Sequence, residues 1–255
     1  HYQQDAVIAH ADLRGDSYQL SKSAAERTDC EAIVFCGVHF MAETADILVN
    51  RPEQMAGRNG SRVNVVLPDT AAGCSMADMA AIEQVEDAWA DLGEIIDTGD
   101  ITPVTYINSA ASLKAFCGRH GGIVCTSSNA VKVIESIPKD QQIIFAPDKN
   151  LGSYLIKETG RDMILWEGSC IVHEAFSFEK IVTLFKQHPN AKFIAHPESE
   201  SQVLDVAQYV GSTSGLLNFI QEDSSTEYIV ATEAGILYEM QKRAPHKTFI
   251  PAPVE

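Results

Sequence analysis

The sequence predicts an α/β protein made of three related units with small parallel sheets, and two observations support this fold class. First, strand-like apolar runs alternate with amphipathic stretches along the chain, a pattern typical of parallel sheets covered by helices on both faces. Second, a hydroxyl residue opens a predicted helix at three places, and an apolar strand follows each of them after 18 residues. The three pairs are Ser17 and Phe35, Ser127 and Phe145, and Thr213 and Ala231. This constant spacing favours three repeated units over one doubly wound sheet.

The expected strands are short runs rich in β-branched and aromatic residues. In chain order they cover residues 33–35, 63–67, 104–107, 122–125, 143–145, 163–166, 192–195 and 228–230. Helices are expected where apolar residues recur at helical spacing, as in residues 78–92 and 202–210. Near the end, the run from Phe249 to Pro253 matches the runs that precede Cys74 and Cys170, so it predicts one more strand.

The repeat is incomplete at both ends of the chain. The first unit lacks the strand that should precede it, and the third unit stops just after Pro253. We therefore expect a chain trimmed at both ends, with units over residues 1–85, 86–173 and 174–255. Ligands of parallel α/β sheets bind at the carboxyl ends of strands, so three such ends facing one centre would form a single shared site.

Composition argues against several classes of function. The chain has 255 residues, 45% of them hydrophobic, which suffices for a large core. Its net charge of -16 disfavours nucleic acids and anionic membrane surfaces as partners. The apolar runs are strand-sized, so no segment is expected to span a membrane. The cysteines lack a Cys-x-x-Cys motif, which argues against a zinc ribbon, and their number in so long a chain predicts a reduced, cytoplasmic protein.

Two cysteines lie in unusual surroundings. Cys74 and Cys170 each follow a strand-like run and a small-residue turn, where a side chain points into a crevice. A thiolate displayed in this way is a metal ligand or a nucleophile before it is a core residue. The repeat makes the two positions equivalent in the first and second units, and it predicts a third cysteine just after Pro253. Because the cysteines are far apart in the sequence, a shared site must be assembled by the whole fold.

Two histidine–glutamate pairs are candidate acid–base groups. His196 and Glu198 come directly after a strand, and they are predicted to transfer protons because histidine titrates near neutrality and glutamate can be tuned towards it. A loop histidine beside a solvated glutamate is the alternative. His173 and Glu174 suggest the same role, or that of zinc ligands with Cys170 at Cys-x-x-His spacing.

Several uncharged polar residues are candidates for binding. Tyr106 and Asn108 alternate at a strand end, so both side chains can face the same side. Ser17, Ser127 and Thr213 are candidate helix N-caps, and a capping hydroxyl contributes about 1 kcal/mol to stability. As equivalents in three units they also predict converging helix N-termini, which hold phosphate or carboxylate groups. That interpretation would reconcile an acidic protein with an anionic ligand.

Together, these segments resemble the quinolinate synthase (NadA) family of NAD biosynthesis, and the resemblance runs nearly end to end. The segments that carry it are residues 1–3 (His-Tyr-Gln), 15–17 (Gly-Asp-Ser), 35–43, 72–77 (Ala-Gly-Cys-Ser-Met-Ala), 106–108 (Tyr-Ile-Asn), 125–130, 147–152 (Pro-Asp-Lys-Asn-Leu-Gly), 166–174, 195–198 (Ala-His-Pro-Glu) and 211–215. No single segment is specific, but the set is.

The resemblance implies three pseudo-symmetric αβα domains around a central active site. It implies a [4Fe-4S] cluster held by one cysteine from each domain, with Cys74 and Cys170 as two ligands and the third expected beyond Glu255. The implied enzyme is a transferase that condenses iminoaspartate with dihydroxyacetone phosphate to give quinolinate, phosphate and water. The iron without a protein ligand would act as a Lewis acid. The resemblance also implies a functional link to an iminoaspartate-producing enzyme in pyridine nucleotide biosynthesis.

The resemblance also suggests roles for single residues. The implied catalytic residues are His196, Glu198, Tyr106, His1 and Tyr2. The implied substrate-binding residues are His1, Ser17, Tyr106, Asn108, Ser127, His173, His196, Glu198 and Thr213. One position departs from the family, which commonly has a tyrosine two residues after the first histidine where this chain has Gln3. A one-residue deletion would let Tyr2 take that role.

Two other functions remain open on the residues alone. One is a zinc hydrolase that uses Cys170, His173 and Glu174. The other is a non-catalytic protein that binds a small anion at the three helix N-termini.

Overall fold

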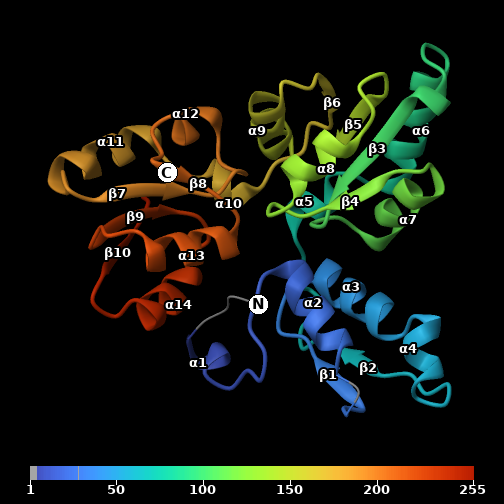
Figure 1. The fold of residues 1–255 in the computed structure, drawn as a ribbon, viewed down its shortest axis with the longest axis horizontal. Coiled ribbons are helices and arrows are strands. Elements are labelled where there is room, and N and C mark those ends of the chain that lie inside the picture. Colours follow the sequence, from blue (N-terminus) through green and yellow to red (C-terminus); the bar gives the residue numbers. More distant parts are fainter. Residues whose placement is uncertain (1–4, 28) are drawn as a thin grey trace.

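The computed structural model describes residues 5–27 and 29–255, which form three groups of elements, each with its own sheet (Figure 1). The first sheet pairs β1 (Ala32–Val34) with β2 (Asn64–Val66). The second has the order β4-β3-β5-β6, with β3 at Ile101–Tyr106, β4 at Ile123–Cys125, β5 at Gln142–Ala146 and β6 at Met163–Leu165. The third has the order β8-β7-β9-β10, with β7 at Lys192–Ala195, β8 at Tyr209–Val210, β9 at Glu227–Ala231 and β10 at Thr248–Pro251.

Helices surround these sheets. Those of the first group are α1 (Asp5–Ile8), α2 (Ser17–Ala25), α3 (His39–Val49) and α4 (Pro52–Ala56). Those of the second are α6 (Ile82–Gly93), the 3-10 turn η1 (Thr98–Asp100), α7 (Ala111–Arg119), α8 (Ala130–Ser136) and α9 (Lys149–Thr159). Those of the third are α11 (Phe178–Gln187), α12 (Ser201–Leu204), α13 (Thr213–Glu222) and α14 (Ile236–Arg243). The short helices α5 (Ser75–Asp78) and α10 (Ile171–Glu174) follow β2 and β6.

The third sheet shows why these sequences form buried parallel strands. Along β7, Phe193 and Ala195 pack on one side with Ile181 of α11, while Ile194 packs on the other side with Leu216 of α13. Successive side chains of a strand point to opposite faces, so a continuous apolar run needs helices on both faces. The predicted α/β class with several small parallel sheets flanked by helices is therefore confirmed, and every pairing between named strands in the described residues is parallel.

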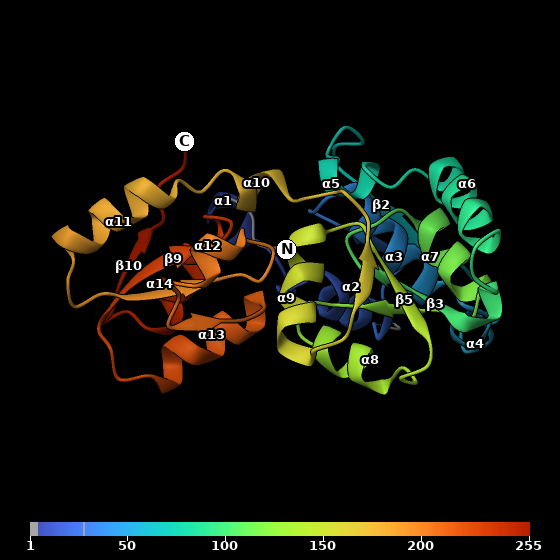
Figure 2. The ribbon, with the colours of Figure 1, turned by 90° about the horizontal axis from the view of Figure 1, so that it is seen from above.

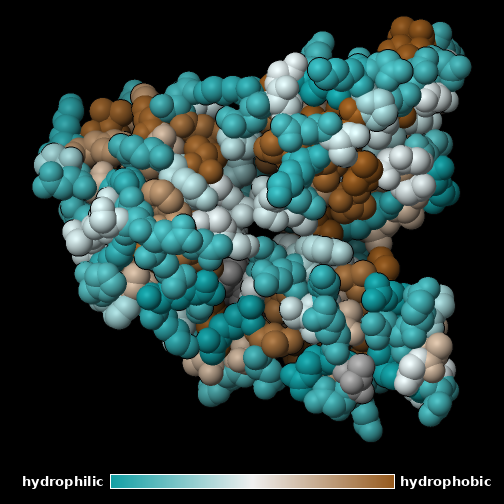
Figure 3. All heavy atoms as spheres, viewed as in Figure 1, coloured by the Kyte–Doolittle hydropathy of each residue, from teal (hydrophilic) through white to brown (hydrophobic). Residues whose placement is uncertain are grey.

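The second and third sheets share one strand order, in which the first strand lies between the second and the third. By the 18-residue spacing, β1 corresponds to β5 and β9, and β2 corresponds to β6 and β10. The predicted strand near Phe249 is confirmed as β10. One sheet falls within each of the ranges 1–85, 86–173 and 174–255, which we propose as domains. In Figure 3 the visible face is mostly hydrophilic and is hollowed between the first and second groups.

Two predicted helices were partly wrong. The stretch 202–210 is helical only to Leu204, because its end adds β8 to the sheet: the Gln208 N–H donates to the Phe193 carbonyl at 2.9 Å. The stretch 78–92 is interrupted before Ile82, where the Trp166 indole N–H donates to the Met79 carbonyl at 2.8 Å. Tertiary partners thus replace the helical hydrogen bonds at both places. In the described part of the chain, no helix is long and apolar enough to cross a membrane.

Candidate active site where the three sheets meet

A cavity of about 200 Å³ lies at the centre of the molecule and is lined from all three groups of elements. All of the described residues that the family resemblance implies for the site line this cavity. They are Ser17, Cys74, Tyr106, Asn108, Ser127, Cys170, His173, His196, Glu198 and Thr213. The predicted residues His1 and Tyr2, together with Gln3, lie outside the described residues.

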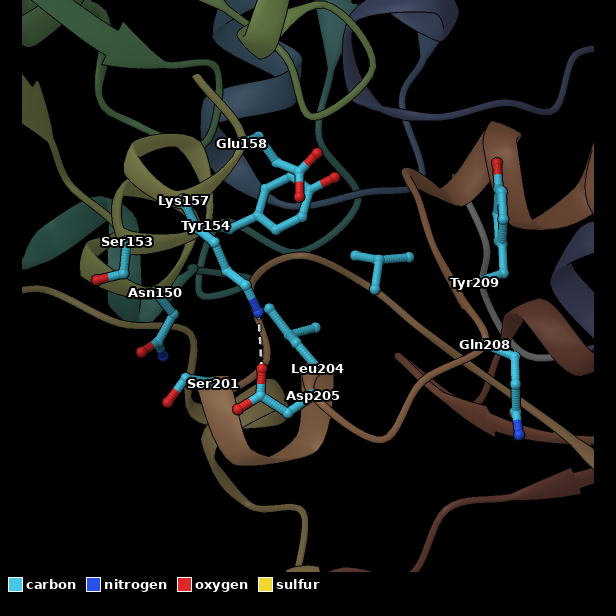
Figure 4. A pocket seen from close by; sticks show the side chains of 11 residues that line it. Asn150, Ser153, Tyr154, Lys157, Glu158, Ser201, Leu204, Asp205, Gln208 and Tyr209 are labelled. Carbon is cyan, nitrogen blue, oxygen red and sulfur yellow. Dashed lines mark hydrogen bonds and ion pairs between the residues drawn. The ribbon is translucent and has the colours of Figure 1, made fainter. Parts of the chain in front are cut away.

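A larger cavity of about 390 Å³ lies between α9 and α12 (Figure 4). Lys157 and Asp205 form an ion pair of 2.7 Å across it, and Tyr154 and Tyr209 stand on opposite sides. This cavity contains no cysteine or histidine, and the paired lysine and aspartate are both largely exposed. Of these two cavities, the smaller central one is lined by the cysteines and histidines.

The chain brings acid–base groups to this centre from strand ends, as ligand sites in parallel sheets require. Tyr106 is the last residue of β3, and His196 directly follows β7. The segment around α10, which carries His173, lies between the second and third groups of elements (Figure 2). Tyr106, His173, His196 and Glu198 are all buried, with exposed fractions of 2–6%.

Glu198 is the hub of a hydrogen-bonded network. The Tyr106 hydroxyl donates to Glu198 Oε1 at 2.6 Å, although the two residues are far apart in the chain. His173 Nδ1 lies 3.1 Å from Glu198 Oε2, and His173 Nε2 lies 3.0 Å from the hydroxyl of Thr232. The rings of His173 and His196 stack with their centroids 4.9 Å apart. The network thus joins the second sheet to the third through side chains.

The surroundings of these groups shift their pKa values and thereby fix the protonation state of each at neutral pH. Burial alone would raise the pKa of Glu198, but His196, His173 and the Tyr106 hydroxyl outweigh it and lower this pKa to about 2. Burial lowers the pKa of His196 to about 4, against the attraction of Glu198. Burial and the Glu198 carboxylate raise the pKa of Tyr106 well above its usual value. At neutral pH the site therefore places a protonated hydroxyl on an ionised carboxylate beside a neutral imidazole, so a proton donor and proton acceptors share one network.

The two cysteines occupy equivalent positions. Cys74 is the N-cap of α5 and Cys170 is the N-cap of α10, and both side chains are half-buried at the cavity. Burial, together with the Glu198 charge, raises the pKa of both thiols. Each therefore carries a proton at neutral pH that metal ligation must displace. Two thiols that line one cavity are donors of the type that iron–sulfur clusters use, so the residues present fit such a group.

A second metal-ligating set includes only one of these cysteines. Cys170, His173 and Glu198 each offer a ligand atom, and these atoms lie within 4.8 Å of one another. Cys170 Sγ is 3.1 Å from His173 Nδ1. Glu174, the carboxylate that the sequence suggested for a zinc site, lies instead 3.8 Å from the Lys149 ammonium group. The carboxylate of this set is therefore Glu198 from the third group of elements, and not Glu174, which is adjacent to His173 in the sequence.

The predicted N-caps were wrong by one or two residues. The caps of α2 and α13 are Asp16 and Ser212, whose side chains accept from the Gln19 and Gly215 N–H groups at 3.1 Å. Ser17 and Thr213 are the first residues of these helices, and Ser127 lies two residues before Asn129, the cap of α8. Their hydroxyls are therefore not the helix caps, and they line the cavity instead.

Sequence reasoning missed Asp16, Thr232 and Asp148. Asp16 caps α2 and accepts a short hydrogen bond from the Ser214 hydroxyl, which links the first group of elements to the third. Thr232 directly follows β9, so the rule of strand ends would have found it. Asp148 lies two residues after the end of β5, and its side chain accepts from the Cys170 N–H at 3.1 Å.

Comparison with known proteins gives one family. The family model described as quinolinate synthetase A protein matches residues 1–255. A quinolinate synthase of Rhodopirellula baltica is 50% identical over 275 residues, which cover 97% of this chain and 70% of that protein. A quinolinate synthase of Trichodesmium erythraeum is 51% identical over 253 residues, which cover 99% of this chain and 72% of that protein. A quinolinate synthase of Gloeothece citriformis is 50% identical over 254 residues, which cover 99% of this chain and 72% of that protein.

Proposed function

The chain belongs to the quinolinate synthetase A family of NAD biosynthesis, and from this we propose that it condenses iminoaspartate with dihydroxyacetone phosphate to form quinolinate. The products would include phosphate and water, and the enzyme would act as a transferase. One observation carries the proposal: the Tyr106 hydroxyl contacts the ionised Glu198 in a cavity that Cys74 and Cys170 also line. Acid–base groups and cluster-type ligands therefore share one space.

We propose that Cys74 and Cys170 hold a [4Fe-4S] cluster, with a third cysteine beyond Glu255. The Glu255 N–H donates to the Ala175 carbonyl at 2.9 Å, so the chain at Glu255 lies beside the end of α10, the short helix that begins just after Cys170. When bound, the cluster would supply an iron that acts as a Lewis acid on a substrate hydroxyl or carboxylate.

The protein residues would manage protons and hold the substrates. Glu198, ionised at neutral pH, would accept a proton, and Tyr106, which keeps its own, would donate one. His196, neutral at pH 7, would exchange protons with a bound intermediate. Asn108 Oδ1 is buried without a hydrogen-bond partner, which supports its role as an acceptor for a substrate group. The hydroxyls of Ser17, Ser127 and Thr213 would bind substrate carboxylates and phosphate.

The proposal is tested with Glu198→Gln and Tyr106→Phe in the full-length protein, loaded with cluster under anaerobic conditions. Each change removes one partner of the proton-transfer pair, and general acid–base groups contribute about 10²–10⁴-fold to rate. We expect kcat for quinolinate formation to fall by about that factor. The matched control is Glu174→Gln, a carboxylate at the end of α10 that pairs with Lys149. Undiminished kcat in both site variants would overturn the proposed roles.

The set Cys170, His173 and Glu198 favours one alternative, a mononuclear metal hydrolase. Cysteine sulfur, histidine nitrogen and glutamate oxygen are all zinc ligands, and a catalytic zinc site has three protein ligands and one open position. Metal analysis of the anaerobically purified protein separates the two functions. Iron and sulfide in cluster proportion support the condensing enzyme, whereas one zinc per chain without iron supports the hydrolase.

A further inference from the structure

Asp148 is a fully buried carboxyl group that joins two segments of the chain. Its Oδ1 accepts from the Leu151 N–H at 2.6 Å and thereby caps α9. Its Oδ2 accepts from the Cys170 N–H at 3.1 Å. The two oxygens therefore tie the start of α9 to the residue that carries one of the two cavity thiols.

No cation contacts this carboxyl group in the described residues. The ammonium group of the adjacent Lys149 lies 3.9 Å from Glu167 and 3.8 Å from Glu174 instead. Burying a carboxyl group without a cation is costly unless its oxygens are hydrogen-bonded. A helix cap needs only one oxygen, and serine or asparagine would supply it. The bond to Cys170 therefore distinguishes Asp148 from an ordinary cap.

Comparison with the first unit isolates the contribution of this side chain. The Lys149 N–H donates to the Gly168 carbonyl at 2.7 Å, and the His39 N–H donates to the Ala72 carbonyl at 2.8 Å. Gly168 and Ala72 each lie two residues before a cavity cysteine, so the backbone framework is repeated. The residue equivalent to Asp148 is Val38, the N-cap of α3, which makes no side-chain capping bond.

We propose that Asp148 is a positioning residue that fixes the direction of the Cys170 side chain through its backbone N–H. The proposal rests on the proposed function, in which Cys170 is a cluster ligand. The repeated backbone framework holds both cysteine loops, and Asp148 adds a restraint on Cys170 that Cys74 lacks. Removal of a residue that orients a metal ligand lowers metal affinity by about 10- to 100-fold.

The main test variant is Asp148→Ser, which keeps an oxygen able to cap α9 but is too short to reach Cys170 as well. Full-length protein is reconstituted with ferrous iron and sulfide under anaerobic conditions, and iron transfer to a ferrous chelator is timed. We expect transfer about 10- to 100-fold faster than in the wild type. The matched control is Asp97→Ser, because Asp97 caps η1 at an exposed position outside the cavity. Transfer at the wild-type rate in Asp148→Ser would overturn the proposal.

A second measurement does not need the cluster. In the metal-free protein, the alkylation rate of Cys170 is compared with that of Cys74 by mass spectrometry. We expect the Cys170 to Cys74 ratio to rise in Asp148→Ser and in Asp148→Asn, which keeps the Leu151 bond but turns an amide N–H towards Cys170. An unchanged ratio in both variants would overturn the proposal. A wild-type protein that binds no cluster would instead defeat the proposed function, and the alkylation ratio would still decide the role of Asp148.

Discussion

At the scale of single residues, Ser17 and Thr213 are left free for the cavity by their neighbours. The side chains of Asp16 and Ser212 accept hydrogen bonds from N–H groups in the first turns of α2 and α13. The hydroxyl of the next residue in each helix is therefore not used as a helix cap. The sequence could predict that these residue types open helices, since hydroxyl and carboxyl residues favour that place. It could not decide between adjacent capping residues, because the choice depends on backbone angles that the sheet imposes.

The contact between Tyr106 and Glu198 was beyond sequence reasoning for a different reason. Each residue was predicted as a site residue from its place at a strand end. Their pairing depends on the relative orientation of the second and third sheets, which cannot be predicted from local sequence patterns. The same holds for the exchange of Glu174 for Glu198 beside Cys170 and His173.

His196 makes a prediction about stability and pH. Burial lowers its pKa from 6.5 to about 4, so the folded protein keeps it neutral while the unfolded chain takes up a proton below pH 6.5. Its contribution to stability is fully present above pH 6.5 and is lost as the pH falls towards 4. The loss should be on the order of 3 kcal/mol, because the pKa falls from 6.5 to about 4 and one pKa unit corresponds to about 1.4 kcal/mol.

The measurement is the free energy of unfolding by urea across that pH range. His196→Gln should show a shallower fall than the wild type, because glutamine does not titrate. His246→Gln is the control, since His246 is exposed on the loop before β10. Parallel pH profiles for the wild type and His196→Gln would contradict the prediction.

At the scale of elements, strands were easier to predict than short helices. A strand such as β7 has the apolar side chains Phe193 and Ile194 buried on opposite faces, so its sequence is apolar throughout. The helix α12 and the strand β8 share one amphipathic stretch, and the sheet edge decides where one ends and the other begins. The Gln208 side chain contributes to that decision, because its Oε1 accepts from the Phe193 N–H at 2.6 Å.

Asp223 at the end of α13 makes a prediction at this scale. Its carboxylate accepts from Lys192 on β7, from the Tyr228 hydroxyl on β9 at 2.7 Å, and from the Ser225 N–H at 3.0 Å. Burial opposes ionisation, but these hydrogen bonds outweigh it and lower the pKa of Asp223. The carboxylate therefore stabilises the fold above the usual aspartate range, and this stabilisation is lost as the pH falls through and below it.

We expect Asp223→Asn to lower the free energy of unfolding at pH 7 by about 2 kcal/mol, the typical value for a hydrogen bond to a charged group. Urea denaturation measures the change. Asp205→Asn is the matched control, because its ion pair with Lys157 is largely exposed and should contribute about 0–1 kcal/mol. Equal effects of the two substitutions would refute the role given to Asp223.

At the scale of the whole molecule, the repeat made the architecture predictable. The 18-residue spacing and the strand ends together predicted three sheets facing a common centre, and the described site residues do line one central cavity. The contacts that hold the three groups together were not predictable, because each joins residues far apart in the sequence. Asp16 contacts Ser214 between the first and third groups, and Tyr106 contacts Glu198 between the second and third.

Glu43 completes this set by joining the first group to the second. Ala110 is the N-cap of α7 and offers no side-chain acceptor, and Glu43 Oε2 on α3 accepts from the Ala111 N–H at 3.1 Å instead. The ammonium group of Lys114, one turn further along α7, lies 5.3 Å from the ring centroid of Phe40 on α3. A helix N-cap supplied by another part of the molecule couples the stability of α7 to the position of α3.

Substitution of Glu43 by alanine should therefore loosen the first group against the second. We expect a loss of about 1 kcal/mol in the free energy of unfolding, the usual cost of a missing N-cap acceptor. Amide hydrogen exchange should become faster in the first turn of α7, where the Ala111 N–H loses its partner. Glu43→Gln keeps an acceptor oxygen and should restore most of the protection, while Glu53→Ala, at an exposed position on α4, should leave α7 unchanged. If exchange in α7 were the same in Glu43→Ala and the wild type, α3 would not cap α7, and the first group would be held by its other contacts alone.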